Sequence, residues 1–319
     1  MKEYIKIPVL IVGGIAIGIL CTLGLMSLTT DNDSSKHSNE VKEFPSAPTS
    51  SQPFIPDEII FCGERVPLEN FDVYEALDYE LVVNMYRHSA TITYLKKANR
   101  YFPEIEKVLK ENDIPEDLKY LCVAESGLSN VVSPAGATGF WQFMKTAGNE
   151  YGLRIDTHVD ERYNHHKSAV AACKYFKDAY KKFKSWTLVA ASYNMGMGGL
   201  SKNIESQKVD NYWDLLLNQE TARYVYRIIA LKLVMENPST YGFNLNEKDL
   251  YDEIETYTIK IDTTISDLTQ FALDNDSNLK MLKYFNPWLR SNSLPNQSRK
   301  EYEIELPKKG VRPCKTNKQ

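Results

Sequence analysis

One glutamate in this sequence occupies a position that suits acid–base chemistry. Residues 115–126 predict a helix whose apolar face carries Leu121 and Cys122, and Glu125 lies one turn further along that face. Gly127 then ends the helix. Burial and the negative end of the helix dipole both disfavour a carboxylate, so we expect a raised pKa and a role as general acid for Glu125. From position alone, a glutamate that reaches solvent at a frayed helix end is the commoner situation.

A glycine-containing loop follows this helix and carries further polar candidates. Residues 127–144 read GLSNVVSPAGATGFWQFM, and their glycines and Ser-Pro pair indicate irregular backbone. Gln142 lies inside an aromatic run, so its amide needs either a backbone or a ligand partner. Further along, the sequence SYNMG brings Tyr193 and Asn194 to the end of another predicted helix, beside a glycine-rich turn.

Helices are the elements that must position these residues. Apolar residues at three- and four-residue spacing predict helices within three long stretches, residues 73–114, 166–183 and 219–237. Pro103 and Pro115 are interpreted as helix starts, and Pro238 as the stop of the last helix. A further helix opens at Trp186 and is expected to break at its three glycines, Gly196, Gly198 and Gly199.

In their order along the chain, these residues resemble the motifs of the lytic murein transglycosylases, a family of the goose-type-lysozyme-like superfamily. Glu125-Ser126 is similar to the catalytic Glu-Ser pair, and the Ser-Pro pair with GATGFWQFM is similar to the family's loop motif. SYNMG is similar to A-Y-N-x-G, with Ser192 in place of alanine, and ETARYVYRI to the E-T-x-x-Y-V helix. Residues 61–119 resemble the helical lead-in of the D-type members, and the resemblance extends over residues 61–244.

The resemblance implies a mainly α fold with a lysozyme-like helical catalytic domain and an N-terminal helical extension. It implies cleavage of the β-1,4 bond between N-acetylmuramic acid and N-acetylglucosamine, with 1,6-anhydro ends and no cofactor. Glu125 would be the single catalytic acid and base. Four residues are expected to act near the cleaved bond: Ser133 and Gln142 would hydrogen-bond the sugars, and Tyr193 and Asn194 would orient Glu125 and the acetamido group. Met144 and Tyr224 are expected to wall the groove.

The C-terminal segment has a different pattern. Residues 255–261 alternate as a strand does, two short helices follow, and residues 300–310 return as a strand. This β-α-α-β order resembles a degenerate LysM carbohydrate-binding module, a small α+β unit. The alternative interpretation is a small capping subdomain without glycan affinity.

The N-terminal segment is long and apolar enough to cross a membrane. Residues 7–28 contain no charged side chain, two lysines precede them and two aspartates follow, which indicates a body outside the cytoplasm. An uncleaved anchor is favoured over a cleaved signal peptide, and a lipoprotein signal is disfavoured because Leu20 precedes Cys21. The expected location is the bacterial cell envelope, with the catalytic domain on the periplasmic side.

These observations predict a domain order and a set of partners. The expected partners are peptidoglycan glycan strands and, through the N-terminus, the membrane, while the net charge of −4 gives no indication of nucleic acid. The expected domains are an anchor or signal segment (1–30), a flexible linker (31–57), a helical extension (58–110), the catalytic domain (111–245) and the LysM-like module (249–310).

The spacing of the cysteines and histidines does not indicate a metal site. Cys122 and Cys173 lie on apolar helical faces and are interpreted as buried thiols, and Tyr226 as a core residue. No metal is expected, because the spacing of His158, His165 and His166 fits no ligand motif. A non-catalytic peptidoglycan-binding scaffold and a membrane-anchored interaction protein are the competing functions, and a glycan-cleavage assay separates them from an enzyme.

Overall fold

The computed structural model describes residues 52–312. The predicted anchor (1–30) and most of the predicted linker (31–57) lie outside these residues, as do Cys21 and Cys314. In the described part, no helix is both long enough and apolar enough to cross a bilayer. The last residues of the predicted linker lie on the body, because the Phe54 carbonyl accepts a hydrogen bond from the Tyr241 hydroxyl at 3.0 Å.

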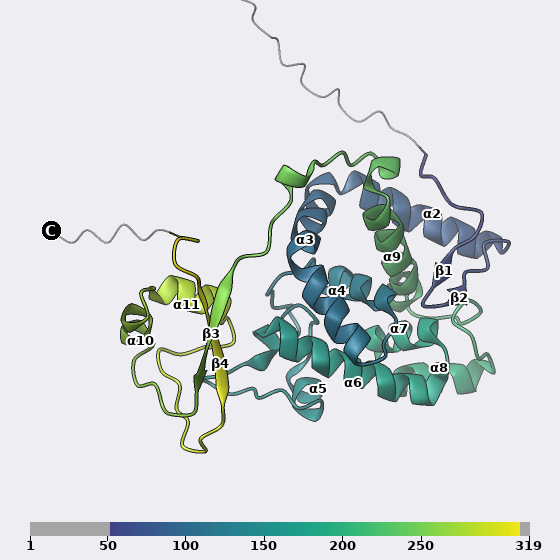
Figure 1. Ribbon diagram of the computed structural model, residues 1–319. Helices are drawn as coiled ribbons and strands as arrows, with labels where there is room; N and C mark the ends of the chain where they lie inside the picture. The colour runs from purple at the N-terminus through teal and green to yellow at the C-terminus, as the bar shows by residue number, and fades with distance from the viewer. Residues whose placement is uncertain (1–51, 313–319) are drawn as a thin grey trace, which may run out of the picture. The chain divides into compact units, whose positions relative to one another are not determined.

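Helices dominate the first part of the fold (Figure 1). A hairpin of β1 (Ile60–Phe61) and β2 (Glu64–Arg65) comes first. The helices that follow are α2 (Phe71–Tyr86), α3 (His88–Glu111), α4 (Lys119–Ser126), α5 (Lys145–Glu150), α6 (His165–Phe183), α7 (Trp186–Met195), α8 (Met197–Gln207) and α9 (Gln219–Glu236). They bury one large apolar core, and the short α4 packs against both α3 and α9. The predicted mainly α class is confirmed.

The helix that carries Glu125 ends where the sequence predicts. Leu118, Leu121 and Cys122 are fully buried, so the apolar face of α4 is turned into the core. Gly127 adopts φ +57°, and a Cβ at this position would lie 2.3 Å from the ring of Tyr94. Only glycine therefore fits at this helix end.

Two sequence expectations about helix boundaries are wrong. Pro103 does not start a helix but lies inside the 24-residue α3. One continuous buried face runs through α3 on both sides of the proline, and its packing outweighs the loss of one backbone hydrogen bond. Likewise, Gly198 and Gly199 do not interrupt the helical backbone, because they lie in the first turn of α8. Gly196 alone separates α7 from α8.

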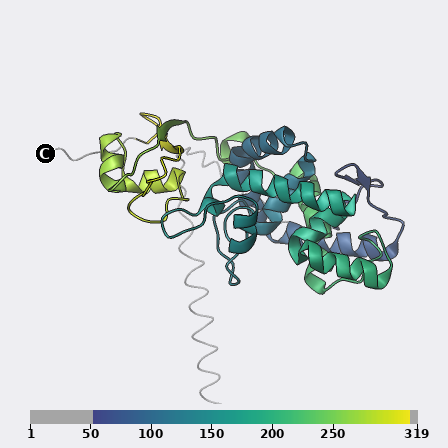
Figure 2. The same ribbon diagram turned by 90° about the horizontal axis from the view of Figure 1, so that it is seen from below.

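The C-terminal module has the predicted β-α-α-β order. It consists of β3 (Thr256–Ile261), α10 (Leu268–Asp274), α11 (Leu279–Phe285) and β4 (Tyr302–Pro307). The strands pair antiparallel, from Thr256 opposite Pro307 to Ile261 opposite Tyr302. Figures 1 and 2 both show the two helices beside this sheet, and the module has an apolar core of its own.

Three assignments of buried residues are confirmed. Cys122 and Cys173 are fully buried free thiols, as predicted. Burial raises the pKa of both thiols, so they remain protonated and unreactive at neutral pH. Tyr226 belongs to the main core, with 7% of its surface exposed.

Candidate active site

Glu125 contacts α9 at the centre of the candidate site. It lies in the last turn of α4, and the hydroxyl of Tyr224 on α9 donates a hydrogen bond to its Oε1. Tyr224 is 2% exposed, whereas Glu125 keeps partial contact with solvent. A carboxyl group in this position is held by the core on one side and stays accessible to a ligand.

The environment of Glu125 raises the pKa of its carboxyl toward neutral pH, so the protonated and ionised forms coexist there. Burial raises the pKa of Glu125 to about 7 and outweighs the hydrogen bond from Tyr224, which lowers it. The charge of Glu220 raises this pKa further, and the charge of Arg227 lowers it. A pKa near the working pH suits a group that must both give and take a proton.

The loop after α4 is stabilised by hydrogen bonds between its own polar side chains and its backbone. Gln142 adopts φ +48°, and its Nε2 donates to the carbonyl oxygens of Gly139 at 2.7 Å and Val131 at 3.1 Å. The partner of the Gln142 amide nitrogen is therefore backbone, one of the two alternatives left open by the sequence. Ser133 Oγ accepts a hydrogen bond from the Ala137 N–H at 3.0 Å. The roles of Ser133 and Gln142 in substrate binding stay predictions.

Tyr193 and Asn194 do not hydrogen-bond Glu125. The Tyr193 hydroxyl donates to the Trp141 carbonyl at 2.6 Å and so ties α7 to the loop. Its own pKa is raised by burial and then by the charge of Glu125, which indicates that the two groups lie close together. Asn194 is held by α9: its Nδ2 donates to Glu220 at 3.2 Å and its Oδ1 accepts from Thr221 at 2.7 Å.

The remaining two predicted site residues differ in exposure. Met144 is 46% exposed at the start of α5, and its role as a groove wall stays a prediction. Tyr224 is buried and hydrogen-bonded to Glu125, whereas its role as a groove wall stays a prediction. The sequence could not show this contact, because the two residues are 99 positions apart.

Sequence reasoning also missed a charged group that joins α2 to α9. Glu80 on α2 is 1% exposed, and its Oε1 accepts a hydrogen bond from Arg223 Nε at 2.6 Å. Arg227, one turn further along α9, has its Nε 3.8 Å from Glu80 Oε2. The signal was a glutamate on the apolar face of a predicted helix, the same kind of signal that identified Glu125.

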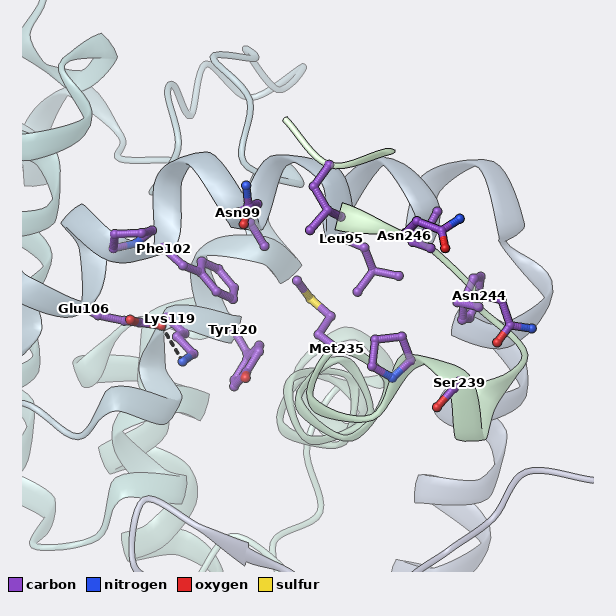
Figure 3. A pocket seen from close by; sticks show the side chains of 16 residues that line it. Leu95, Asn99, Phe102, Glu106, Lys119, Tyr120, Met235, Ser239, Asn244 and Asn246 are labelled. Carbon is purple, nitrogen blue, oxygen red and sulfur yellow. Dashed lines mark hydrogen bonds and ion pairs between the residues drawn. The ribbon is translucent and has the colours of Figure 1, made fainter. Parts of the chain in front are cut away.

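A cavity of about 790 Å³ lies between α3, α4 and α9, away from these residues. Figure 3 shows Leu95, Phe102 and Met235 around it. Lys119 on its wall forms an ion pair with Glu106 at 2.6 Å, drawn as a dashed line. None of the predicted site residues lines this cavity, so it is not part of the candidate active site.

His158, His165 and His166 each have a polar partner within the protein. His165 Nε2 and His166 Nδ1 lie 2.6 and 3.2 Å from the carboxylate oxygens of Glu104, and His158 Nδ1 lies 2.7 Å from Ser291 Oγ. Within residues 52–312, no group of three or more His, Cys, Asp or Glu side chains is arranged to hold a metal ion.

Comparison with known proteins adds independent information. A family model described as the transglycosylase SLT domain matches residues 102–216, and one described as the soluble lytic transglycosylase C-terminal LysM-like domain matches residues 257–310. Similar curated proteins are the membrane-bound lytic murein transglycosylases D of Escherichia coli K12 and of Escherichia coli O6:H1. Each is 30% identical over 198 residues, which cover 59% of this chain and 43% of the relative. The matched region thus spans less than half the length of these relatives, and the first domain match contains Glu125, the loop and SYNMG.

Proposed function

We propose that this chain, which carries a transglycosylase SLT domain and a LysM-like C-terminal domain, is a lytic transglycosylase that cleaves peptidoglycan glycan strands. The observation that carries the proposal is the state of Glu125. Its carboxyl has a pKa raised to about 7, is hydrogen-bonded to Tyr224, and is still partly exposed to solvent. This combination is what a general acid for a glycosidic bond requires.

The reaction proceeds in two proton transfers through one residue. Glu125 protonates the glycosidic oxygen between N-acetylmuramic acid and N-acetylglucosamine, and the bond to C1 breaks to give an oxocarbenium- or oxazolinium-like cation. The Glu125 carboxylate then takes the proton of the muramic C6 hydroxyl as O6 attacks C1. A 1,6-anhydro end forms, no water is consumed, and Glu125 returns to its protonated state. The nucleophile belongs to the same sugar, so proximity supplies part of the rate.

Other site residues support this cycle. The Tyr224 hydroxyl stabilises the carboxylate that exists between the two transfers, because its hydrogen bond lowers the pKa of Glu125. Ser133, Gln142, Met144, Tyr193 and Asn194 form the sugar-binding surface around it. No described residue donates to Gln142 Oε1, which leaves that acceptor for a sugar hydroxyl or amide.

The location that fits this substrate is the bacterial cell envelope. The apolar segment at residues 7–28 would tether the enzyme to the membrane with its catalytic domain on the periplasmic side. Fractionation of cells that produce the full chain tests this, with extraction by detergent but not by high salt as the expected result. Release by salt alone would argue against a membrane anchor.

Glu125→Gln tests the proposed catalytic role. The amide keeps the shape of the side chain and can still accept from Tyr224, but it cannot deliver a proton, so release of fragments from purified sacculi should fall at least about a thousandfold. Glu205→Gln, an exposed position on α8, serves as a control and should retain full activity. Substantial turnover by a folded Glu125→Gln enzyme would remove Glu125 from the mechanism.

A hydrolase is the second candidate, and Glu220 is the observation that favours it. Its carboxylate is exposed at the start of α9 and close enough to raise the pKa of Glu125, so it could serve as the base that activates a water. The mass of the released muropeptides separates the two reactions. Anhydro ends, about one water lighter than hydrolysis products, support the transglycosylase, and reducing ends alone would establish the hydrolase.

A further inference from the structure

Arg162 connects two points of the loop that carries Gln142. Its Nη1 donates to the carbonyl oxygens of Gly136 and Phe143, both at 3.1 Å. Its Nε and Nη2 donate to Asp160 Oδ1 and Oδ2 at 3.0 and 2.8 Å. Arg162 and Asp160 are only 9% and 7% exposed. The carboxylate fixes the orientation of the guanidinium, and the guanidinium in turn fixes the two loop carbonyls.

The main chain beside Arg162 contacts the same loop directly. Asn130 Nδ2 donates to the Tyr163 carbonyl at 3.2 Å. A Cβ at Gly139 would lie 1.9 Å from the Arg162 carbonyl oxygen, so glycine alone permits this approach. The loop and the segment of residues 158–163 therefore fit against each other by backbone as well as by side chain.

The segment of residues 158–163 is also docked on the C-terminal module. The Asp160 N–H donates to the Trp288 carbonyl at 2.9 Å, and the His158 carbonyl accepts from the Arg290 N–H at 2.8 Å. Val159 is fully buried and belongs to the apolar core of the module. One short segment thus joins the module to the loop of the candidate active site.

We propose that Arg162 is a positioning residue, which holds residues 133–144 of this loop in their substrate-binding shape. The C-terminal module secures Arg162 by holding Asp160 and Val159. The effect on turnover rests on the proposed function, whereas the effect on the loop does not. Lysine cannot replace Arg162, because a single ammonium group on a flexible stem cannot bind both carboxylate oxygens and reach two loop carbonyls.

Arg162→Lys in the full chain is the first test. We expect kcat on soluble glycan strands to fall at least about tenfold per folded molecule, since a small displacement of a positioning loop is enough to misplace the substrate. Amide hydrogen exchange in peptides covering residues 133–144 should become faster, while exchange in the core helices stays unchanged. Asp160→Asn weakens the two hydrogen bonds between Arg162 and residue 160 without removing Arg162, so it should change both readouts in the same direction. It replaces Arg162→Lys as the test if that variant does not fold.

Arg65→Lys is the matched control. Arg65 also forms a two-pronged pair with a carboxylate, Glu69, with both hydrogen bonds at 2.8 Å, but it is exposed and lies in β2. The same substitution there should change neither kcat nor loop exchange.

Val159→Thr tests the contribution of the module. It places a hydroxyl in the module core with little change in shape, so amide exchange in the loop should become faster and kcat should fall. Both effects should be smaller than those of Arg162→Lys. In the double variant of Arg162→Lys and Val159→Thr, kcat should fall by less than the product of the two single fold-losses, because both changes loosen the same connection.

The possible outcomes separate this inference from the proposed function. A purely structural role would lower the melting temperature but leave kcat per folded molecule and loop exchange unchanged, and this result would overturn the inference. Multiplicative losses in the double variant would overturn the part assigned to the module. If the wild-type protein cleaves no glycan while loop exchange responds as expected, the proposed function fails and the positioning of the loop stands.

Discussion

The protonation state of one carboxyl group determines how this site should respond to pH. The pKa of Glu125 is raised to about 7, mainly by burial, and only the protonated form can act as the acid. Because Tyr224 lowers this pKa through its hydrogen bond, the two side chains set the upper pH limit of activity together.

Tyr224→Phe should move the alkaline limb of the pH–rate profile. In the wild-type protein, kcat/KM should fall as the pH rises through about 7 and Glu125 loses its proton. Without the Tyr224 hydroxyl the pKa of Glu125 rises, so the limb moves to higher pH, while kcat falls because the carboxylate has lost a donor. Tyr226→Phe, two positions away in the core, is the control. An unmoved limb in Tyr224→Phe would show that this hydroxyl does not act on Glu125.

The same pKa makes stability depend on pH. An acid whose folded-state pKa lies above its ordinary value of 4.5 contributes stability that is fully present below about pH 4.5 and is lost as the pH rises through about 7. Between these two pH values, the free energy of unfolding of the wild-type protein should fall by up to about 3 kcal/mol relative to that of Glu125→Gln. Urea denaturation of both proteins at pH 4.5 and pH 8 measures this. Equal pH dependence of the two would mean that Glu125 is not buried as described.

At the scale of elements, the first helical turn of α7 is held by a residue far away in the sequence. Glu64 on β2 accepts hydrogen bonds from the N–H groups of Trp186 at 2.5 Å and Thr187 at 3.1 Å. The carboxylate therefore neutralises the positive end of the helix that carries Tyr193 and Asn194.

Glu64→Gln should weaken this helix start. The loss of the negative charge, and of one of two acceptor oxygens, should lower the free energy of unfolding by about 1–2 kcal/mol. Thermal denaturation should show a drop of several degrees. Glu69→Gln, whose exposed pair with Arg65 caps no helix, should leave the free energy of unfolding nearly unchanged. Equal stability of the two variants would contradict a capping role for Glu64.

Local signals in the sequence were enough to place most elements. The apolar face of α4 with Gly127 behind it, and the alternation of β3 and β4, are visible within about ten residues. Pro103 shows where local reasoning fails, because tertiary packing keeps α3 helical through it. The contacts of Tyr224 with Glu125 and of Glu80 with Arg223 join helices far apart in sequence, so no spacing rule reveals them.

Over the described residues as a whole, one buried carboxylate joins the helical part of the fold to the C-terminal module. Glu161 has a side chain only 3% exposed, and its Oε1 lies 2.6 Å from Lys167 Nζ and 3.4 Å from Lys300 Nζ. Lys300 belongs to the module, just before β4. Glu161 also follows Asp160 directly, so it stabilises the segment that holds Arg162.

Glu161→Gln should therefore loosen the attachment of the module. Burial alone would raise the pKa of Glu161, but hydrogen bonds from Lys167 and the Arg154 N–H hold it below its ordinary value. Its contribution is thus present above the unfolded pKa and is lost as the pH falls through the folded pKa. At pH 7 the free energy of unfolding of the variant should be about 1–2 kcal/mol lower than that of the wild type. The effect is kept to this size because both lysines are partly exposed, and solvent screens their charges.

Thermal denaturation between pH 3 and pH 7 measures this contribution. The difference between the wild type and Glu161→Gln should shrink toward acid pH, because protonation removes the charge that the variant already lacks. Glu303→Gln, an exposed position on β4 paired with Lys260 inside the module, is the matched control and should change little at any pH. If the difference in stability between the wild type and Glu161→Gln stayed constant down to pH 3, the charge of Glu161 would not be what attaches the module. Its hydrogen bonds as a neutral group would then account for the attachment.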